Sequence, residues 1–151
     1  MSRALLDSNV VLRLLAKNDP RHPAADRCVV TALRAGHDLY IAPQVIMESW
    51  VVLTRPVIVN CFGWPPSAAH ETLEGAMAMF SLLPETPDVF AMWWRWVHVV
   101  GTGVRGKRAH DLRLDSLMRV HGVRFVVTFN VQDFAGLDEI TAISPDGEIP
   151  A

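Results

Sequence analysis

Short apolar runs that end in polar side chains recur along this chain and alternate with stretches of helical periodicity. The first such run, residues 4–6, stops abruptly at Asp7, and the apolar residues from Val10 onward are spaced for a helix. A strand followed at once by a helix is the building unit of a parallel sheet. The pattern therefore predicts a buried strand that carries Asp7 to the sheet edge where open α/β folds bind ligands.

Two roles are open for Asp7 from this corner alone, and the pattern favours them equally. The carboxylate either binds a ligand or merely caps the helix that follows. Ser8 and Asn9 can also cap that helix, because their side-chain oxygens accept hydrogen bonds from the first backbone amides.

Further strands are expected at residues 38–42, 81–84, 124–128 and 139–143, with helices between them. Pro43 suits the first position of the helix that follows the second strand. Crossovers between parallel strands are right-handed and place helices over the faces of the sheet. We therefore predict an α/β fold of one domain spanning residues 1–151, a three-layer α/β/α sandwich with a central parallel sheet of four to five strands.

Composition limits the classes of function. Half of the 151 residues are hydrophobic, which favours a packed globule with some apolar surface for a partner. A net charge of −2 gives no general attraction to nucleic acid, so such a role needs a local basic patch. The two cysteines form no disulfide framework, and no run approaches the ~18 apolar residues of a spanning helix. We expect a soluble cytoplasmic protein that does not contact a membrane.

The predicted topology places further polar side chains at the edge that Asp7 occupies. Clustered carboxylates repel one another and raise each other's pKa unless a cation neutralises them. Oxygen donors without Cys or clustered His select a hard ion, Mg²⁺ or Mn²⁺. We therefore predict a metal site that hydrolyses the nucleic-acid backbone. The side chains that join Asp7 are Glu48, Asp111, Asn130 and Asp133.

Each of these acidic residues also has an ordinary structural explanation. Asp111 would interact favourably with a helix N-terminus, and Asp133 would suit a turn. Glu48 would pair with Arg55 on a half-exposed face. Convergence of all of them on one edge by chance is less favoured than a shared site.

Asp115 stands four residues after Asp111 on the same helical face. It either adds a carboxylate to the site or pairs with Arg119 at the surface. We favour the pair, because Asp115 lies a full turn further from the sheet edge.

Basic residues gather beside Asp111, between residues 105 and 124. They form either a solvated helix face or a patch that holds the phosphates of a nucleic acid. Their position next to Asp111 favours nucleic-acid contact for Lys107 and Arg108.

The ordered set of motifs resembles the PIN-domain ribonucleases and, within them, the VapC toxins of bacterial type II toxin–antitoxin pairs. The resemblance covers nearly the whole chain in the same order and spacing, although no single tetrapeptide is specific. Its matching segments are residues 5–10, 44–48, 106–114 and 128–134.

This resemblance implies a flavodoxin-like sheet, Mg²⁺- or Mn²⁺-dependent endoribonuclease activity, a homodimer, and inhibition by a small VapB-type antitoxin laid over the active groove. Asp7, Glu48 and Asp111 match the first three acidic positions, and we assign Asp7 and Asp111 as the metal ligands. Asn130 stands where many PIN domains have a fourth Asp. Asp133, three residues later, is therefore the fourth catalytic carboxylate that we predict, with Asn130 as a substrate contact.

The remaining substrate-binding residues that we predict are Ser8, Lys107 and Arg108. Asn130 keeps one alternative open, a PIN-like module that binds RNA or protein without cutting it. A phosphatase that forms an aspartyl-phosphate is disfavoured, because the chain lacks an Asp-x-Asp motif at Asp7.

Three tryptophans of one predicted helix occupy both of its faces. Trp93 and Trp96 share a side and are expected to pack in the core. Trp94 is a candidate for an antitoxin or dimer contact, and base stacking by this group is the less favoured alternative.

Overall fold

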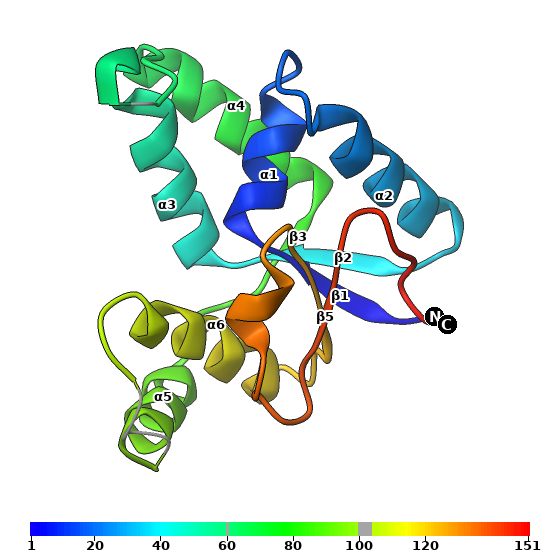
Figure 1. The fold of residues 1–151 in the computed structure, drawn as a ribbon, viewed down its shortest axis with the longest axis vertical. Coiled ribbons are helices and arrows are strands. Elements are labelled where there is room, and N and C mark those ends of the chain that lie inside the picture. The colour runs from blue at the N-terminus through cyan, green and yellow to red at the C-terminus, as the bar shows by residue number, and fades with distance from the viewer. Residues whose placement is uncertain (60, 100–103) are drawn as a thin grey trace.

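The computed structural model describes residues 1–59, 61–99 and 104–151 and shows a three-layer α/β/α sandwich (Figure 1). All strand pairs are parallel, and the sheet order is β3-β2-β1-β4-β5. The predicted fold is therefore confirmed, with five strands. The strands are β1 (Arg3–Leu6), β2 (Asp38–Ile41), β3 (Ser81–Leu82), β4 (Phe125–Val127) and β5 (Thr141–Ile143).

In the part of the chain that the structure describes, six α-helices and two 3₁₀ turns connect the strands. Helices α1 to α4 lie on one side of the sheet, and α5 and α6 lie on the other (Figure 1). The helices are α1 (Ser8–Leu15), α2 (His22–Arg34), α3 (Pro43–Thr54), α4 (Pro66–Met79), α5 (Pro87–Val99) and α6 (Arg108–Val120), and the 3₁₀ turns are η1 (Val57–Val59) and η2 (Val131–Phe134). Within the described residues, no helix is long and apolar enough to cross a membrane.

The central strand β1 is covered by helices on both faces. Ala4, Leu5 and Leu6 are fully buried, which explains why the strand is a continuous apolar run and not an alternating one. β1 pairs with β2 on one side and with β4 on the other, with Leu5 opposite Tyr40 and Val126. This central position is what brings Asp7 to the middle of the carboxyl edge.

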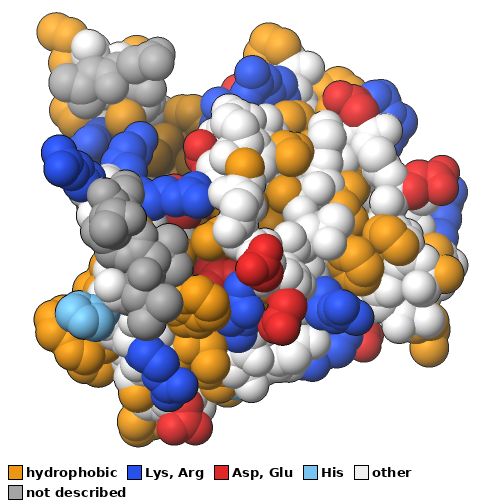
Figure 2. All heavy atoms as spheres, turned by 60° about the horizontal axis from the view of Figure 1, so that its bottom comes forward, with side chains coloured by type: hydrophobic (Ala, Val, Ile, Leu, Met, Phe, Trp, Pro, Cys, Tyr) orange, Lys and Arg blue, Asp and Glu red, His pale blue; other side chains and the backbone are white. Residues whose placement is uncertain are grey.

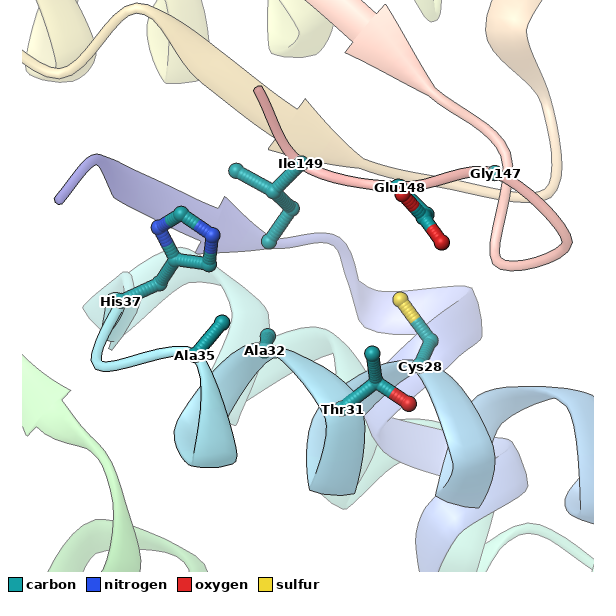
Figure 3. A pocket seen from close by; sticks show the side chains of 8 residues that line it. All are labelled: Cys28, Thr31, Ala32, Ala35, His37, Gly147, Glu148 and Ile149. Atoms are coloured by element: carbon teal, nitrogen blue, oxygen red, sulfur yellow. The ribbon is translucent and has the colours of Figure 1, made fainter. Parts of the chain in front are cut away.

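The amino edge of the sheet is where the two chain ends meet (Figure 1). The backbone N–H of Ser2 donates to His37 Nδ1 at 3.0 Å, and the Ser2 hydroxyl donates to the Pro150 carbonyl at 2.6 Å. A small pocket of about 120 Å³ separates α2 from the C-terminal segment, with the Cys28 sulfur pointing toward that segment (Figure 3). Burial raises the pKa of the Cys28 thiol, so Cys28 acts as a small buried apolar residue.

Candidate active site

One pocket of about 220 Å³ at the carboxyl edge collects the polar side chains that end β1 and β4 and begin α3 and α6. It brings together every residue that the sequence assigned to the site except Arg108. Asn9, Gln44 and His110 also line it. The predicted residues in its wall are Asp7, Ser8, Glu48, Lys107, Asp111, Asn130 and Asp133.

Asp7 takes the capping role that the sequence left open, and its side chain also lines the pocket. Its backbone is extended and its Oδ1 accepts a hydrogen bond from the Ser8 amide at 2.8 Å, so Asp7 caps α1. Ser8 is consequently the first residue inside the helix, and neither Ser8 nor Asn9 is the cap. Burial raises the pKa of the Asp7 carboxyl against the lowering effect of its hydrogen bonds, and the nearby Glu48 and Asp133 raise it further.

A hydrogen-bond network holds Asp7 against the end of β4. The buried Thr128 hydroxyl donates to Asp7 Oδ2 at 2.8 Å and accepts hydrogen bonds from Asn9 Nδ2 and the Asn130 amide at 3.1 and 3.0 Å. The Asn9 carboxamide oxygen accepts from the Phe129 amide at 3.1 Å. The two strand ends are therefore fixed relative to each other.

Thr128 and Asn9 were not assigned to the site from the sequence. The available signal was the one that identified Asp7, because Thr128 is the first polar residue after an apolar run at the same sheet edge. Hydroxyl and amide side chains are common in turns, however, so that signal alone does not separate support of a carboxylate from local capping.

Glu48 enters the pocket from α3 through a partner one turn earlier. Its Oε1 accepts a hydrogen bond from Gln44 Nε2 at 2.8 Å, in place of the alternative pairing with Arg55. The Gln44 oxygen accepts from Arg113 Nη1 at 3.0 Å, and Arg113 Nη2 forms an ion pair with Glu85 at 2.8 Å. A polar chain thus runs from α6 to the Glu48 carboxylate.

Asp111 carries the clearest electrostatic sign of a shared site. Burial raises the pKa of its carboxyl to about 6, with further increases caused by the neighbouring Asp133, Asp7 and Glu48 and a lowering effect from Arg108. Asp133, Asp7 and Glu48 are therefore close enough to Asp111 to disfavour its ionised form.

Arg108 has a structural role that the sequence did not predict. Its guanidinium donates to the backbone carbonyls of Asp133 and Ala135, the latter at 2.9 Å, and so holds the loop after β4 against the start of α6. Asn130 is exposed at the entrance of the same loop. The guanidinium that we had assigned to phosphate contact thus positions Asp133.

Asp115 forms the predicted pair with Arg119 but in the interior, so its predicted surface location is wrong. It is 0% exposed, and its two carboxylate oxygens accept from Arg119 Nε at 3.0 and 2.9 Å. Arg119 also forms an ion pair with Glu139 at 3.1 Å, and its guanidinium lies 4.7 Å from the Trp96 ring centroid. Asp115 is therefore not a member of the pocket.

Three of the six basic residues between positions 105 and 124 are engaged by other groups of the chain. Arg108, Arg113 and Arg119 are each engaged by carbonyls or carboxylates, as described above. Figure 2 shows acidic, basic and hydrophobic side chains interspersed over much of one face of the molecule, with several basic side chains gathered at its upper left. Lys107, exposed and in the pocket wall, is the predicted phosphate contact that the structure leaves at the site.

The donor chemistry of the pocket fits a hard divalent ion. Its acidic side chains offer only oxygen atoms, and burial and mutual repulsion give them a need for positive charge. Among the described residues, no group of three or more His, Cys, Asp or Glu side chains is arranged to hold a metal ion. A site of two direct carboxylates completed by waters, as Mg²⁺ commonly has, fits both facts.

No family model matches the sequence, and no curated protein matches it by sequence similarity. Solved structures do match. VapBC2 from Rickettsia felis bound to a promoter DNA fragment aligns with a TM-score of 0.70 at 10% identity, over 94% of this chain and 98% of that one. DNA-bound VapBC from Salmonella typhimurium gives 0.66 at 19% identity, over 96% and 99%.

A third structure is VapC20 from Mycobacterium tuberculosis, described as a toxin that cleaves the sarcin-ricin loop. It aligns with a TM-score of 0.57 at 19% identity, over 91% of this chain and 98% of that one. Because each alignment spans nearly the whole of both chains at low identity, the likeness is one of fold. The chain has the PIN-like α/β/α fold of the VapC-type proteins, as its ordered motifs predicted.

Proposed function

We propose that this chain is a VapC-type toxin, a metal-dependent endoribonuclease that cleaves RNA phosphodiester bonds. The observation that supports this proposal most strongly is the gathering of Asp7, Glu48, Asp111 and Asp133 around one pocket, from four separate parts of the chain. A pocket that costs the folded protein repulsion among its own carboxylates is best explained by a cationic ligand. The fold shared with VapC20, a ribonucleolytic toxin, supports the same activity.

The four carboxylates have different proposed roles, which follow from their positions in the pocket. Asp7 and Asp111 are the proposed ligands of Mg²⁺ or Mn²⁺, with Glu48 and Asp133 beside them in the same wall. When bound, a hard divalent ion supplies Lewis-acid chemistry that acidifies water and offsets the charge developing on the phosphoryl oxygens. Thr128 holds the Asp7 carboxylate in place, and Gln44 holds that of Glu48.

Substrate contacts are proposed for the exposed rim of the pocket. Lys107 provides a positive charge for a backbone phosphate, and Ser8 and Asn130 provide polar groups at the mouth. Arg108 contributes by holding the loop that carries Asp133.

A protein partner is part of the proposal. Several of the matched structures contain VapB with VapC, which supports a small VapB-type antitoxin as the inhibitor of this chain, and we propose a homodimer as its assembly. Exposed apolar side chains on α3, Met47 and Val51, offer a surface for such a chain.

Cleavage of total bacterial RNA by the purified, antitoxin-free protein tests the activity. We expect discrete fragments with Mg²⁺ or Mn²⁺, none with EDTA, and none from Asp7→Asn. Absence of cleavage by a folded protein under every metal condition would favour the PIN-like binding module that Asn130 keeps open. Cleavage by Asp7→Asn at the parent rate would contradict the metal assignment.

A further inference from the structure

A second pocket lies between α5 and α6, beside the carboxylate pocket, with a volume of about 330 Å³. His110 lines both pockets, so they share a wall. The chemistry proposed above uses none of the aromatic side chains of this second pocket. Its lining residues are Glu85, Phe90, Trp93, Ala109, His110 and Arg113.

The aromatic wall of this pocket is held in a fixed arrangement. Trp93 Nε1 donates a hydrogen bond to the Ala109 carbonyl at 2.8 Å, which ties the indole of α5 to the start of α6. The Phe90 ring lies 6.0 Å from the Trp93 ring, centroid to centroid, at an interplanar angle of 35°. Phe90 is 65% exposed, so an apolar ring face is open to a ligand at the mouth of the pocket.

The polar rim of the pocket is electrically compensated. Arg113 forms an ion pair with Glu85 at 2.8 Å and donates to Gln44 at 3.0 Å. Because the guanidinium charge is already balanced, the rim suits neither a phosphate nor a carboxylate as its main ligand. Its Glu85, His110 and Arg113 side chains offer hydrogen-bond donors and acceptors to a flat, uncharged group.

We propose that this pocket, which we call the base pocket, binds one unstacked base of the RNA next to the phosphodiester that is cleaved; the inference rests on the proposed function. A nucleobase is flat, uncharged and rich in both donors and acceptors, and single-stranded RNA is recognised by stacking such bases on aromatic side chains. The pocket wall holds hydrogen-bonding side chains beside the rings, which the edge of a base can use and an apolar side chain of a protein partner cannot.

The base pocket also communicates with the cleavage site. Arg113 and Glu48 contact opposite ends of the same Gln44 carboxamide. A base that engages Arg113 therefore acts on the side chain that orients Glu48. Lys107 lines the carboxylate pocket together with the shared His110, so its ammonium group is available to a phosphate of an RNA that enters both pockets.

Substitution of Phe90 tests the base pocket without touching the carboxylates. Phe90→Leu keeps an apolar side chain but removes the ring face, whereas the matched control Phe90→Tyr keeps the ring. Both are made in the Asp7→Asn protein, which prevents cleavage, and binding is measured with a fluorescein-labelled single-stranded RNA of twelve nucleotides containing all four bases. We expect Phe90→Leu to weaken binding by about fivefold to tenfold and Phe90→Tyr by less than about twofold.

Salt dependence and base removal identify the cause of that loss. Phe90→Leu should leave the slope of log Kd against log salt concentration unchanged, since stacking releases no counterions, whereas Lys107→Ala should lower it. Replacing the nucleotides one at a time by abasic residues should reveal one position whose base matters in the Asp7→Asn parent. In Phe90→Leu, removal of that base should cost no further affinity.

The assignment of the base pocket to RNA would be overturned if the Phe90→Leu variant bound RNA as tightly as the parent, or if Phe90→Tyr weakened binding as much as Phe90→Leu. It would also be overturned if the folded parent did not bind RNA. Inhibition by an antitoxin that is lost in Phe90→Leu at unchanged RNA affinity would also overturn it, by assigning the pocket to a protein. Ring-dependent binding without cleavage by the unsubstituted protein would retain the base pocket and reject the nuclease. Cleavage by the unsubstituted protein, with RNA binding that does not depend on the Phe90 ring, would retain the nuclease and reject the base pocket.

Discussion

Asp111 and Asp115 lie one turn apart on α6, and their surroundings are opposite. Asp115 is fully buried, and both of its oxygens accept hydrogen bonds from Arg119. Asp111 lines an open pocket beside Asp133, Asp7 and Glu48, and its pKa is raised to about 6. The Asp115 carboxylate is compensated within the chain, whereas the Asp111 carboxylate lies beside other groups of its own charge.

The two carboxylates also differ in the charges that act on their pKa values. Burial pushes the pKa of Asp115 upward, and the Arg119 guanidinium opposes that effect. Asp111 is only partly buried, and the effect of its burial on the pKa is reinforced by three carboxylates and opposed by Arg108. Asp115 thus has its countercharge within the chain, whereas the pocket around Asp111 is a candidate site for a cation.

The largest effect on stability is expected from breaking the interior pair. Arg119→Met leaves the Asp115 carboxylate buried without its partner, which costs about 3–5 kcal/mol of unfolding free energy. Urea denaturation of the metal-free protein measures this loss. The double variant Asp115→Leu with Arg119→Met should recover much of it, and a single Arg119→Met variant as stable as the parent would contradict the structural role of the pair.

Asp111→Asn should lower cleavage while leaving stability intact. The substitution removes a repelled charge, so the fold is kept or slightly stabilised, while cleavage falls by at least about a hundredfold because a metal ligand is lost. Rates of RNA cleavage and melting temperatures, measured on the same samples, provide the comparison. A similar loss of cleavage in a folded Asp115→Ala protein would place Asp115 in the site and erase the distinction.

The pH dependence of stability sharpens the comparison further. The pKa of Asp111 rises from an ordinary 3.8 to about 6 in the folded protein, so the folded state binds more protons between those values. The stability that protonated Asp111 contributes is therefore complete below about pH 4 and is lost as the pH rises through about 6.

Melting temperatures in EDTA from pH 4 to pH 8 test that sign. The advantage of Asp111→Asn over the parent should grow as the pH rises through this window and then remain constant. An advantage that shrinks with rising pH would show that the folded protein favours the ionised carboxylate, contrary to a repelling cluster.

The smallest effect on cleavage and stability is expected from substitution of Thr128, which positions Asp7 and is not a proposed metal ligand. Thr128→Val removes the hydrogen bond to Asp7 and should lower cleavage by about tenfold, with about 1 kcal/mol lost in stability. Thr128→Ser keeps the hydroxyl and should retain most of the activity. Equal cleavage by the Val and Ser variants would show that the hydroxyl does not position Asp7.

The sequence predicted the parts of the site that depend on local pattern. An apolar run that ends in a polar residue located Asp7. The helix after the second strand located Glu48, and a place at the start of a helix located Asp111, because strand ends and helix starts meet at one sheet edge. The parallel sheet then followed from the alternation of elements, and the structure confirms it.

Partner choice could not be predicted in the same way. Arg108, Arg113 and Arg119 stand close together in the sequence, but one holds a loop, one pairs with Glu85 and one enters the interior. These fates depend on contacts between distant segments, which the spacing of charges along one helix does not specify. The burial of Asp115 could not be predicted for the same reason, because the i, i+4 spacing of an ion pair is the same on the surface and in the core.

The most direct test of the central claim is a crystal of the antitoxin-free protein soaked in Mn²⁺ and measured for anomalous scattering. We predict a peak within ligand distance of Asp7 and Asp111 that is absent from crystals of Asp111→Asn. A map without a peak in this pocket, from crystals whose Asp7 and Asp111 are free of lattice contacts, would contradict the claim that these uncompensated carboxylates form a metal site.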